Sequence, residues 1–136
     1  MAARKPVSRK KYFTAAQANA MLPLVRRIVQ DITELANELR ERQARIAHLQ
    51  GEEQLRLEDE FERGRERMSE LIEELRKLGV ELKDFFMGLV DFPCWMDGRE
   101  VCLCWRQGEP EVGHWHEVDA GFAGRQKLLQ EAPGRD

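Results

Sequence analysis

The sequence predicts an α+β fold, in which a long antiparallel helical hairpin with coiled-coil-like packing precedes a small, mostly antiparallel sheet of three or four strands. Apolar residues recur at steps of three and four between Thr14 and Gly79 and change to the alternating period of strands afterwards. The length of 136 residues fits one domain, and 35% charged against 7% aromatic residues suits an elongated hairpin with a small core.

We expect residues 14–127 to form this single domain, with the hairpin in 14–79 and the sheet, together with a glycine-flanked turn, in 80–127. Residues 1–13 read as a basic disordered arm and 128–136 as a disordered tail. The formal charge of the chain is −3, and the part after the arm is acidic. This balance argues against nucleic-acid binding, except through the arm at residues 4–11.

Hydropathy and cysteine usage predict the compartment. No apolar run approaches the roughly 18 residues that cross a bilayer, so we expect no membrane span, and the start lacks the apolar stretch of a secretory signal. The chain is therefore expected to be cytoplasmic. Its three cysteines, Cys94, Cys102 and Cys104, are then expected to be free thiols.

The first helix is expected to begin after Thr14. Thr14 and Gln17 have the spacing of a capping box, in which each side chain satisfies the other residue's backbone N–H. Pro23 follows within the same pattern, where it removes the hydrogen bond to the carbonyl of Asn19. We therefore expect a kink at Pro23, or a short helix followed by a long one.

Two series of positions predict the hairpin. The first is Val25, Ile28, Ile32, Leu35, Leu39, Arg42 and Ile46, and the second is Leu57, Phe61, Gly64, Met68, Leu71, Leu75 and Leu78. If the chain folds back at Gly51 and Glu52, the residues of the two series that face each other have residue numbers that sum to 103. Gly64 then faces Leu39 and leaves room for its side chain. The packing of one narrow seam against another follows from this pairing.

Gly79 is expected to end the second helix in the left-handed conformation, with Val80 making the accompanying apolar contact. After it, the strand candidates are residues 79–83, 88–92, 99–105 and 111–116. Residues 84–88, 93–98 and 107–110 carry turn-forming residues. Trp105 and Trp115 are expected to close the sheet against the helices.

The segment 102–119 raises the question of a metal site. Cys102 and Cys104 share one face of a strand, and so do His114 and His116. A four-residue loop at 107–110 would put the two pairs on opposite faces, whereas a three-residue loop at 108–110 would place Cys102 opposite His116 and Cys104 opposite His114. Even then, alternate side chains lie roughly 6.5–7 Å apart, so a Cys2His2 zinc would require distorted strands.

A looser metal site would use His116 with Glu117, Asp119 or Cys104. The catalytic interpretation takes Cys104 as nucleophile and His116 as base, with carboxylates at Asp91, Glu117 and Asp119. The competing interpretation is that Cys104, between Leu103 and Trp105, is a small buried side chain.

Gly121 and Gly124 bracket a turn after the last expected strand, and Arg125 follows it. The Arg125 guanidinium could bind a carboxylate or phosphate of a ligand. Alternatively, it forms a structural pair with Asp119 or Asp91.

The segments "YFTAAQANAMLPLV", "LGVELKD", "GLVDFP" and "REVCLCWRQGEPEVGHWHEVDAGFAGRQ" resemble the bacterial domain-of-unknown-function family 2203, over about residues 12–127. The positions that match its motif are Asp91, Phe92, Pro93, Cys104, Trp105, Trp115, His116, Asp119, Gly121, Gly124 and Arg125. The resemblance implies the helical hairpin with a sheet, and it brings no established activity.

Two functions remain open. The first is a non-enzymatic protein-interaction or scaffolding module with a protein partner, or one that self-associates through Ala36, Leu55 and Ile72. The second is a small-ligand or metal-binding protein, and even an enzyme, with a site around His116, Asp119 and Arg125, where Asp91 also binds the ligand. No cofactor is expected under the first interpretation, and a divalent metal is the alternative under the second.

Overall fold

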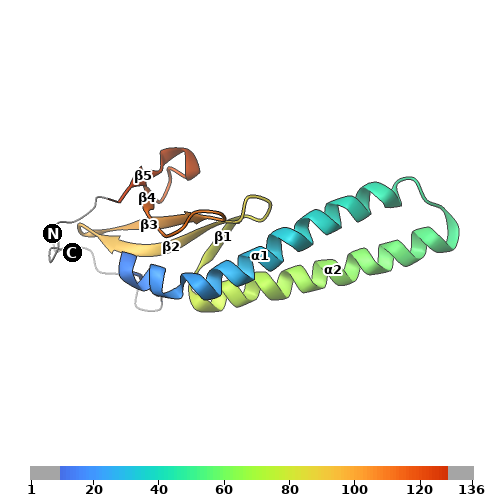
Figure 1. Ribbon diagram of the computed structural model, residues 1–136, viewed down its shortest axis with the longest axis horizontal. Coiled ribbons are helices and arrows are strands. Elements are labelled where there is room, and N and C mark those ends of the chain that lie inside the picture. Colours follow the sequence, from blue (N-terminus) through green and yellow to red (C-terminus); the bar gives the residue numbers. More distant parts are fainter. Residues whose placement is uncertain (1–9, 129–136) are drawn as a thin grey trace.

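Two long antiparallel helices carry a five-stranded sheet at one end in the computed structural model, which describes residues 10–128 (Figure 1). Helix α1 spans Ala15–Ile46 and α2 spans Gly51–Leu78. The sheet lies over the start of α1 and the end of α2, whereas the connection between the helices projects well beyond the sheet. The α+β hairpin-and-sheet prediction is confirmed. Within 10–128, neither helix is apolar enough over a sufficient length to cross a membrane.

The start of α1 has the expected capping box. The backbone N–H of Gln17 donates to Thr14 Oγ1 at 3.1 Å, and the N–H of Thr14 donates to Gln17 Oε1 at 2.9 Å. Of the two alternatives expected at Pro23, a short helix followed by a separate long one is wrong, because α1 runs unbroken through this residue. The turns before it contribute Ala18 and Leu22, which are buried in the core.

The hairpin follows the expected register. Residues 47–50 connect the helices, just before Gly51. A Cβ added to Gly64 would lie 2.4 Å from Leu39 Cδ2, so the missing side chain makes room for Leu39. Arg42 Nε is 3.8 Å from Glu60 Oε1. Glu60 directly precedes Phe61, the residue that the register places opposite Arg42. At the other end, Gly79 adopts φ 88°, which ends α2 as predicted.

The sheet is an antiparallel meander in the order β1-β2-β3-β4-β5. The strands are β1 (Glu81–Asp84), β2 (Leu89–Met96), β3 (Arg99–Arg106), β4 (His114–Glu117) and β5 (Gln126–Lys127). Five strands replace the expected three or four. The additional one is β5, which pairs with β4 after the 3-10 turn η1 (Phe122–Gly124).

Strand β2 continues through Pro93, so the turn expected at 93–98 shortens to Asp97 and Gly98. In a strand the N–H and C=O of one residue point to the same side. The Pro93 carbonyl accepts from Phe13 N–H at 2.7 Å, which places the proline nitrogen on that side and not on the side of β3. The missing N–H therefore breaks no ladder hydrogen bond.

The two faces of the sheet differ in content. The face toward the helices carries the core, including Phe92, Leu103 and Trp105, which are fully buried. The indole N–H of Trp105 donates to the carbonyl of Glu109 at 3.0 Å, and Trp115 is partly buried against the same core. Alternation along the strands leaves Asp91, Cys102, Cys104 and His116 on the opposite face, which we call the outer face.

Residues 10–13, assigned above to the basic arm, pack on the sheet. Phe13 is 2% exposed and stacks edge-on against Phe92. Lys10 Nζ is 2.6 Å from Glu100 Oε2, and the Tyr12 hydroxyl donates to Glu100 Oε1 at 3.0 Å. The rest of the arm, including its basic residues before Lys10, and the tail after Leu128 lie outside the described residues.

Candidate functional site

A polar cluster of Asp91, Cys104 and His116 lies on the outer face of the sheet. His116 Nε2 is 3.0 Å from each carboxylate oxygen of Asp91. One ligand atom from each of the three side chains lies within 4.8 Å of the others. Their exposed fractions are 2%, 0% and 2%, so the cluster is as buried as the apolar core.

Strand register brings the three residues together. Asp91 of β2 pairs with Cys104 of β3, and His116 of β4 pairs with Cys102, next to Cys104 along the same face. Directly paired residues of antiparallel strands project to the same side, so the cluster is fixed by backbone pairing on three neighbouring strands. The observed pairing of Cys102 with His116 and Cys104 with His114 is the one expected for the three-residue loop.

The second ring nitrogen of His116 fixes its orientation and tautomer. Nδ1 lies 2.7 Å from the backbone carbonyl of Glu117. A carbonyl oxygen can only accept, so Nδ1 carries a proton and donates it. One further proton is then shared between Nε2 and the Asp91 carboxylate. The pair is either an imidazolium with a carboxylate or a neutral imidazole with a carboxylic acid.

The thiols of the outer face are weak acids. Burial, followed by the charge of Asp91, raises the pKa of Cys102 and of Cys104 to about 12. Burial also raises the pKa of Cys94 on the core face. A thiolate is the nucleophilic form, so a Cys104 that stays protonated near neutral pH disagrees with the catalytic interpretation.

Two of the predicted site residues lie apart from this cluster. The Asp119 side chain is exposed in the turn after β4, and Asp119 is not part of the group formed by Asp91, Cys104 and His116. Glu117 projects to the face opposite His116 and pairs with Arg99 at 3.0 Å from Nε to Oε1. A site made of His116 with Glu117 or Asp119 is therefore not what the fold assembles.

Arg125 pairs with Glu109 instead of Asp119 or Asp91. Its Nη2 donates to both Glu109 carboxylate oxygens at 2.7 and 2.8 Å. Burial raises the pKa of Glu109, but the hydrogen bonds from Arg125 and from the Arg106 N–H outweigh burial, so this pKa is lowered overall. The stabilisation is present above the ordinary Glu pKa and is lost as the pH falls through the lowered one. The pair fastens the glycine-flanked turn to the β3–β4 loop.

A hollow of about 640 Å³ reaches the edge of the polar cluster beside β1. Asp91 and Cys102 belong to its lining, together with the charged side chains of Lys10, Lys83 and Glu100. Lys83 Nζ is 2.9 Å from Glu81 Oε1, and Lys10 is paired with Glu100. The hollow therefore provides an approach to Asp91 from the free edge of β1, between apolar and charged side chains.

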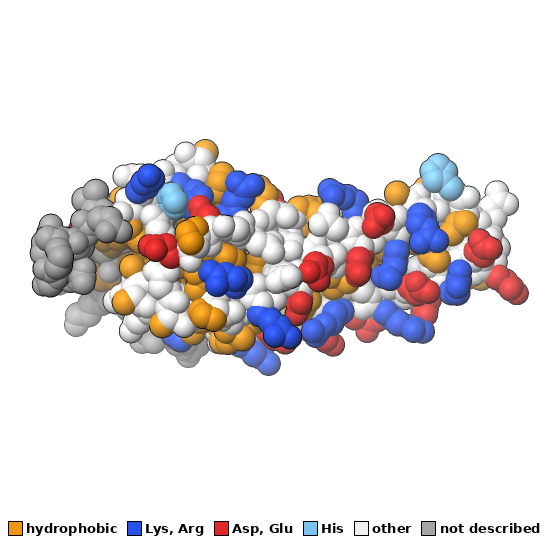
Figure 2. Space-filling view, in the orientation of Figure 1, with side chains coloured by type: hydrophobic (Ala, Val, Ile, Leu, Met, Phe, Trp, Pro, Cys, Tyr) orange, Lys and Arg blue, Asp and Glu red, His pale blue; other side chains and the backbone are white. Residues whose placement is uncertain are grey.

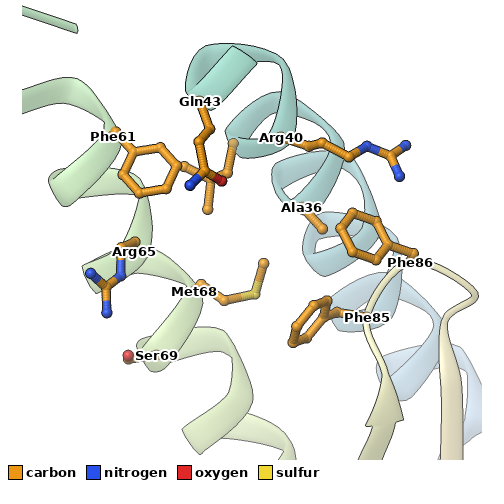
Figure 3. A pocket seen from close by; sticks show the side chains of 10 residues that line it. Ala36, Arg40, Gln43, Phe61, Arg65, Met68, Ser69, Phe85 and Phe86 are labelled. Atoms are coloured by element: carbon orange, nitrogen blue, oxygen red, sulfur yellow. The ribbon is translucent and has the colours of Figure 1, made fainter. Parts of the chain in front are cut away.

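A second, apolar groove lies where the β1–β2 turn meets the hairpin, and Phe85 lines both it and the hollow beside β1. The groove has a volume of about 480 Å³, and its apolar walls are formed by Leu39, Phe61, Met68, Phe85 and Phe86. Figure 3 shows Phe85 and Phe86 reaching from the turn toward side chains of both helices. Each phenylalanine remains 43% exposed, which leaves considerable apolar surface in contact with water.

Local interactions fix the turn that carries Phe85 and Phe86. Asp84 Oδ1 accepts from the backbone N–H of Phe86 at 2.9 Å and of Met87 at 2.8 Å. A Cβ on Gly88, which has φ 68°, would lie 2.9 Å from Val29 Cγ1. The turn is therefore seated closely on α1, and both aromatic rings are held over the groove.

The sequence did not reveal this groove, because residues 84–88 read only as a turn. The three residues expected to support self-association lie in different surroundings. Ala36 is buried at the groove, Ile72 lines the hollow beside β1, and Leu55 is 66% exposed in the projecting part of α2. The signal for the groove in the sequence was the pair of adjacent aromatic residues, Phe85 and Phe86, in a turn.

The comparisons with known proteins show the family and bring no activity. Neither the curated proteins nor the solved structures include a match to the chain. The model of the family described as "Uncharacterized conserved protein (DUF2203)" matches residues 11–128, which covers both helices and the complete sheet. The residues of the polar cluster and of the groove all fall within this match, and the chain therefore belongs to the DUF2203 family.

Proposed function

We propose that the chain is a non-enzymatic interaction module whose groove, between the β1–β2 turn and the hairpin, binds an amphipathic segment of another protein. The exposure of Phe85 and Phe86 at the groove carries the proposal. A cytoplasmic location is part of the same proposal.

The groove has the size and lining of a peptide-binding surface. Its volume falls within the roughly 300–1,000 Å³ of pockets that bind small ligands. Aromatic residues and methionine are the types enriched where proteins contact each other. Phe61, Met68 and Phe86 supply them here from α2 and from the turn. One or two apolar side chains of a partner would cover this surface.

Charge selects the chemistry of the partner. The groove lining includes Arg40 and Arg65 and no Asp or Glu. Arg40 stacks over Phe86 with 4.5 Å between its Cζ and the ring centroid, and it bonds to the neutral Asn37 side chain. Arg65 forms an exposed 3.6 Å pair with Glu62, a type of pair that contributes little. A segment with apolar anchors and acidic neighbours fits this groove.

Elsewhere the projecting part of the hairpin mixes both signs of charge. Figure 2 shows acidic and basic side chains interspersed along it. Such a surface is well solvated and offers no preferred sign to a partner. The groove differs from this surface because its lining combines aromatic side chains with arginines and contains no acidic side chain.

Selection from a displayed library of amphipathic peptides tests the proposal. We expect the enriched peptides to carry aromatic or aliphatic anchors beside Asp or Glu. Their affinity for the purified full chain should fall at least about 10-fold in Phe86→Ala, since truncating a central aromatic anchor costs more than about 1.4 kcal/mol. Arg40→Glu should shift the selected peptides toward basic residues.

Leu55→Ala is the matched control, because it removes an exposed apolar side chain outside the groove and should leave affinity unchanged. Thermal unfolding verifies that each variant is folded. Peptides that bind Phe86→Ala and the wild type equally would contradict the proposal. So would a concentration-dependent dimer abolished by Phe86→Ala, because the occupant would then be a second copy of the chain.

A further inference from the structure

We infer that Asp91, Cys104 and His116 bind one zinc ion, or a divalent transition metal with similar ligand preferences, on the outer face of the sheet. The inference goes beyond the interaction role. It rests on three side chains that do not belong to the groove lining, so either proposal can fail without the other.

The spacing of the three ligand atoms is close to that of a metal site. Zinc bonds of about 2.0–2.3 Å at tetrahedral angles hold ligand atoms about 3.3–3.6 Å apart. The 3.0 Å between His116 Nε2 and the Asp91 oxygens needs to open by a few tenths of an ångström. The largest separation in the cluster is at most 4.8 Å, so Cys104 Sγ needs to move inward by about 1.2 Å or less. Side-chain rotation supplies movements of this size.

The orientation of His116 is that of a metal ligand. Histidines that bind metals commonly donate their other ring N–H to a carboxylate or backbone carbonyl, which fixes the ring and directs the free nitrogen to the metal. His116 donates Nδ1–H to the Glu117 carbonyl at 2.7 Å and directs Nε2 at the cluster. A metal at the cluster would replace the proton that Nε2 shares with Asp91, and it would displace the thiol proton of Cys104.

The donor set selects the metal. One thiolate, one imidazole and one carboxylate favour zinc and its transition-metal neighbours over calcium and magnesium, which prefer oxygen ligands alone. Within residues 10–128 the group contains these three side chains and not Cys102. The fourth position is left for water or for a ligand that enters through the hollow beside β1, whose lining includes Asp91.

Cobalt binding is the direct test, because a thiolate on Co²⁺ produces a charge-transfer absorption in the near ultraviolet. The full chain is stripped with a chelator, freed of chelator and titrated with Co²⁺, and Zn²⁺ affinity is measured by competition with a chromophoric chelator. We expect one metal per chain and the thiolate band. Cys104→Ser should abolish the band and weaken Zn²⁺ binding more than about 100-fold, beyond what loss of a supporting group costs.

Cys94→Ser is the matched control, because Cys94 is a buried thiol on the core face and should not affect binding. Asp91→Asn provides a second variant that preserves side-chain size, and it should weaken Zn²⁺ binding without removing the thiolate band. Failure of the folded wild-type chain to bind Co²⁺ would overturn the inference. A thiolate band that persists in Cys104→Ser would also overturn it.

Discussion

At the scale of single residues, the pair of His116 and Asp91 stands out because both side chains are polar and 2% exposed. Three hydrogen-bond contacts surround the imidazole, two to Asp91 and one to the Glu117 carbonyl. Removing the His116 ring would leave the buried Asp91 carboxyl group without its main partner. Burying such a group without a partner costs far more free energy than leaving it in water. Each partner therefore offsets the cost of burying the other in the metal-free protein.

His116→Ala tests this contribution. In the presence of a chelator, we expect the free energy of unfolding to fall by about 3–5 kcal/mol, because one partner of a buried polar pair is deleted. Asp119→Ala, which alters an exposed carboxylate in the turn two residues after Glu117, should stay within about 0.5 kcal/mol of the wild type. Urea denaturation followed by circular dichroism measures both. A loss below about 1 kcal/mol in His116→Ala would show that the pair has no structural role.

At the scale of elements, the hairpin was predictable because helix packing is encoded in local spacing. The capping box at Thr14, the room at Gly64 for Leu39 and the left-handed Gly79 each depend on side chains close in sequence or on a simple index sum. These predictions are confirmed. Pro23 failed as a helix divider because burial of Ala18 and Leu22, a tertiary effect, outweighs the lost hydrogen bond.

The sheet and the polar cluster were predictable only in part, because they depend on register between strands. Cys104 and His116 were candidates, and Asp91 was placed in the same ligand site as His116, but the direct hydrogen bond between His116 and Asp91 was not predicted. The signal was the Asp97-Gly98 pair, which has positive φ at both positions and closes a two-residue hairpin turn. That turn pairs Met96 with Arg99 and consequently Asp91 with Cys104. Taking residues 93–98 as a longer turn concealed this register.

The pairing of Arg125 with Glu109 had no comparable signal. It joins the loop after β3 to the turn after β4, and neither segment has a repeating pattern that sets the position of the other. Strand β5 is similarly short and exposed, so its two residues lack the alternation that marks a strand. Contacts of this kind are decided by the assembled fold.

The β1–β2 turn provides a prediction at the same scale. Gly88→Ala and Gly108→Ala both place a side chain at positive φ, 68° and 103°, which costs about 1–3 kcal/mol each. A Cβ added to Gly88 would also lie 2.9 Å from Val29 Cγ1 and 2.7 Å from Gln107 Cβ. By contrast, nothing lies within 4 Å of a Cβ added to Gly108. We expect Gly88→Ala to be the more destabilising by about 1–3 kcal/mol, through overpacking. Equal losses in chemical denaturation would mean that the turn is not seated on α1.

At the scale of the whole molecule, burial is uneven along the long axis. The sheet-bearing end contains the core, and the last buried residue of α1 is Ala36. Beyond it, the projecting part of the hairpin buries Leu57 and Gly64 of α2. With so little apolar surface removed from water, helix propensity and exposed ion pairs contribute a larger share of its stability.

Hydrogen exchange followed by mass spectrometry tests this uneven stability. Local opening needs less free energy where few apolar contacts are broken, so amides in residues 40–60 should exchange faster than those of β2, β3 and the first half of α1. Leu57→Ala deletes one of the few buried side chains there and should accelerate exchange in the projecting part while leaving the sheet nearly unchanged. Leu55→Ala, at a neighbouring position that is 66% exposed, should change neither. Equal acceleration of the sheet and the hairpin by Leu57→Ala would instead mean that the molecule opens as one cooperative unit, because the two ends would then share a single unfolding equilibrium.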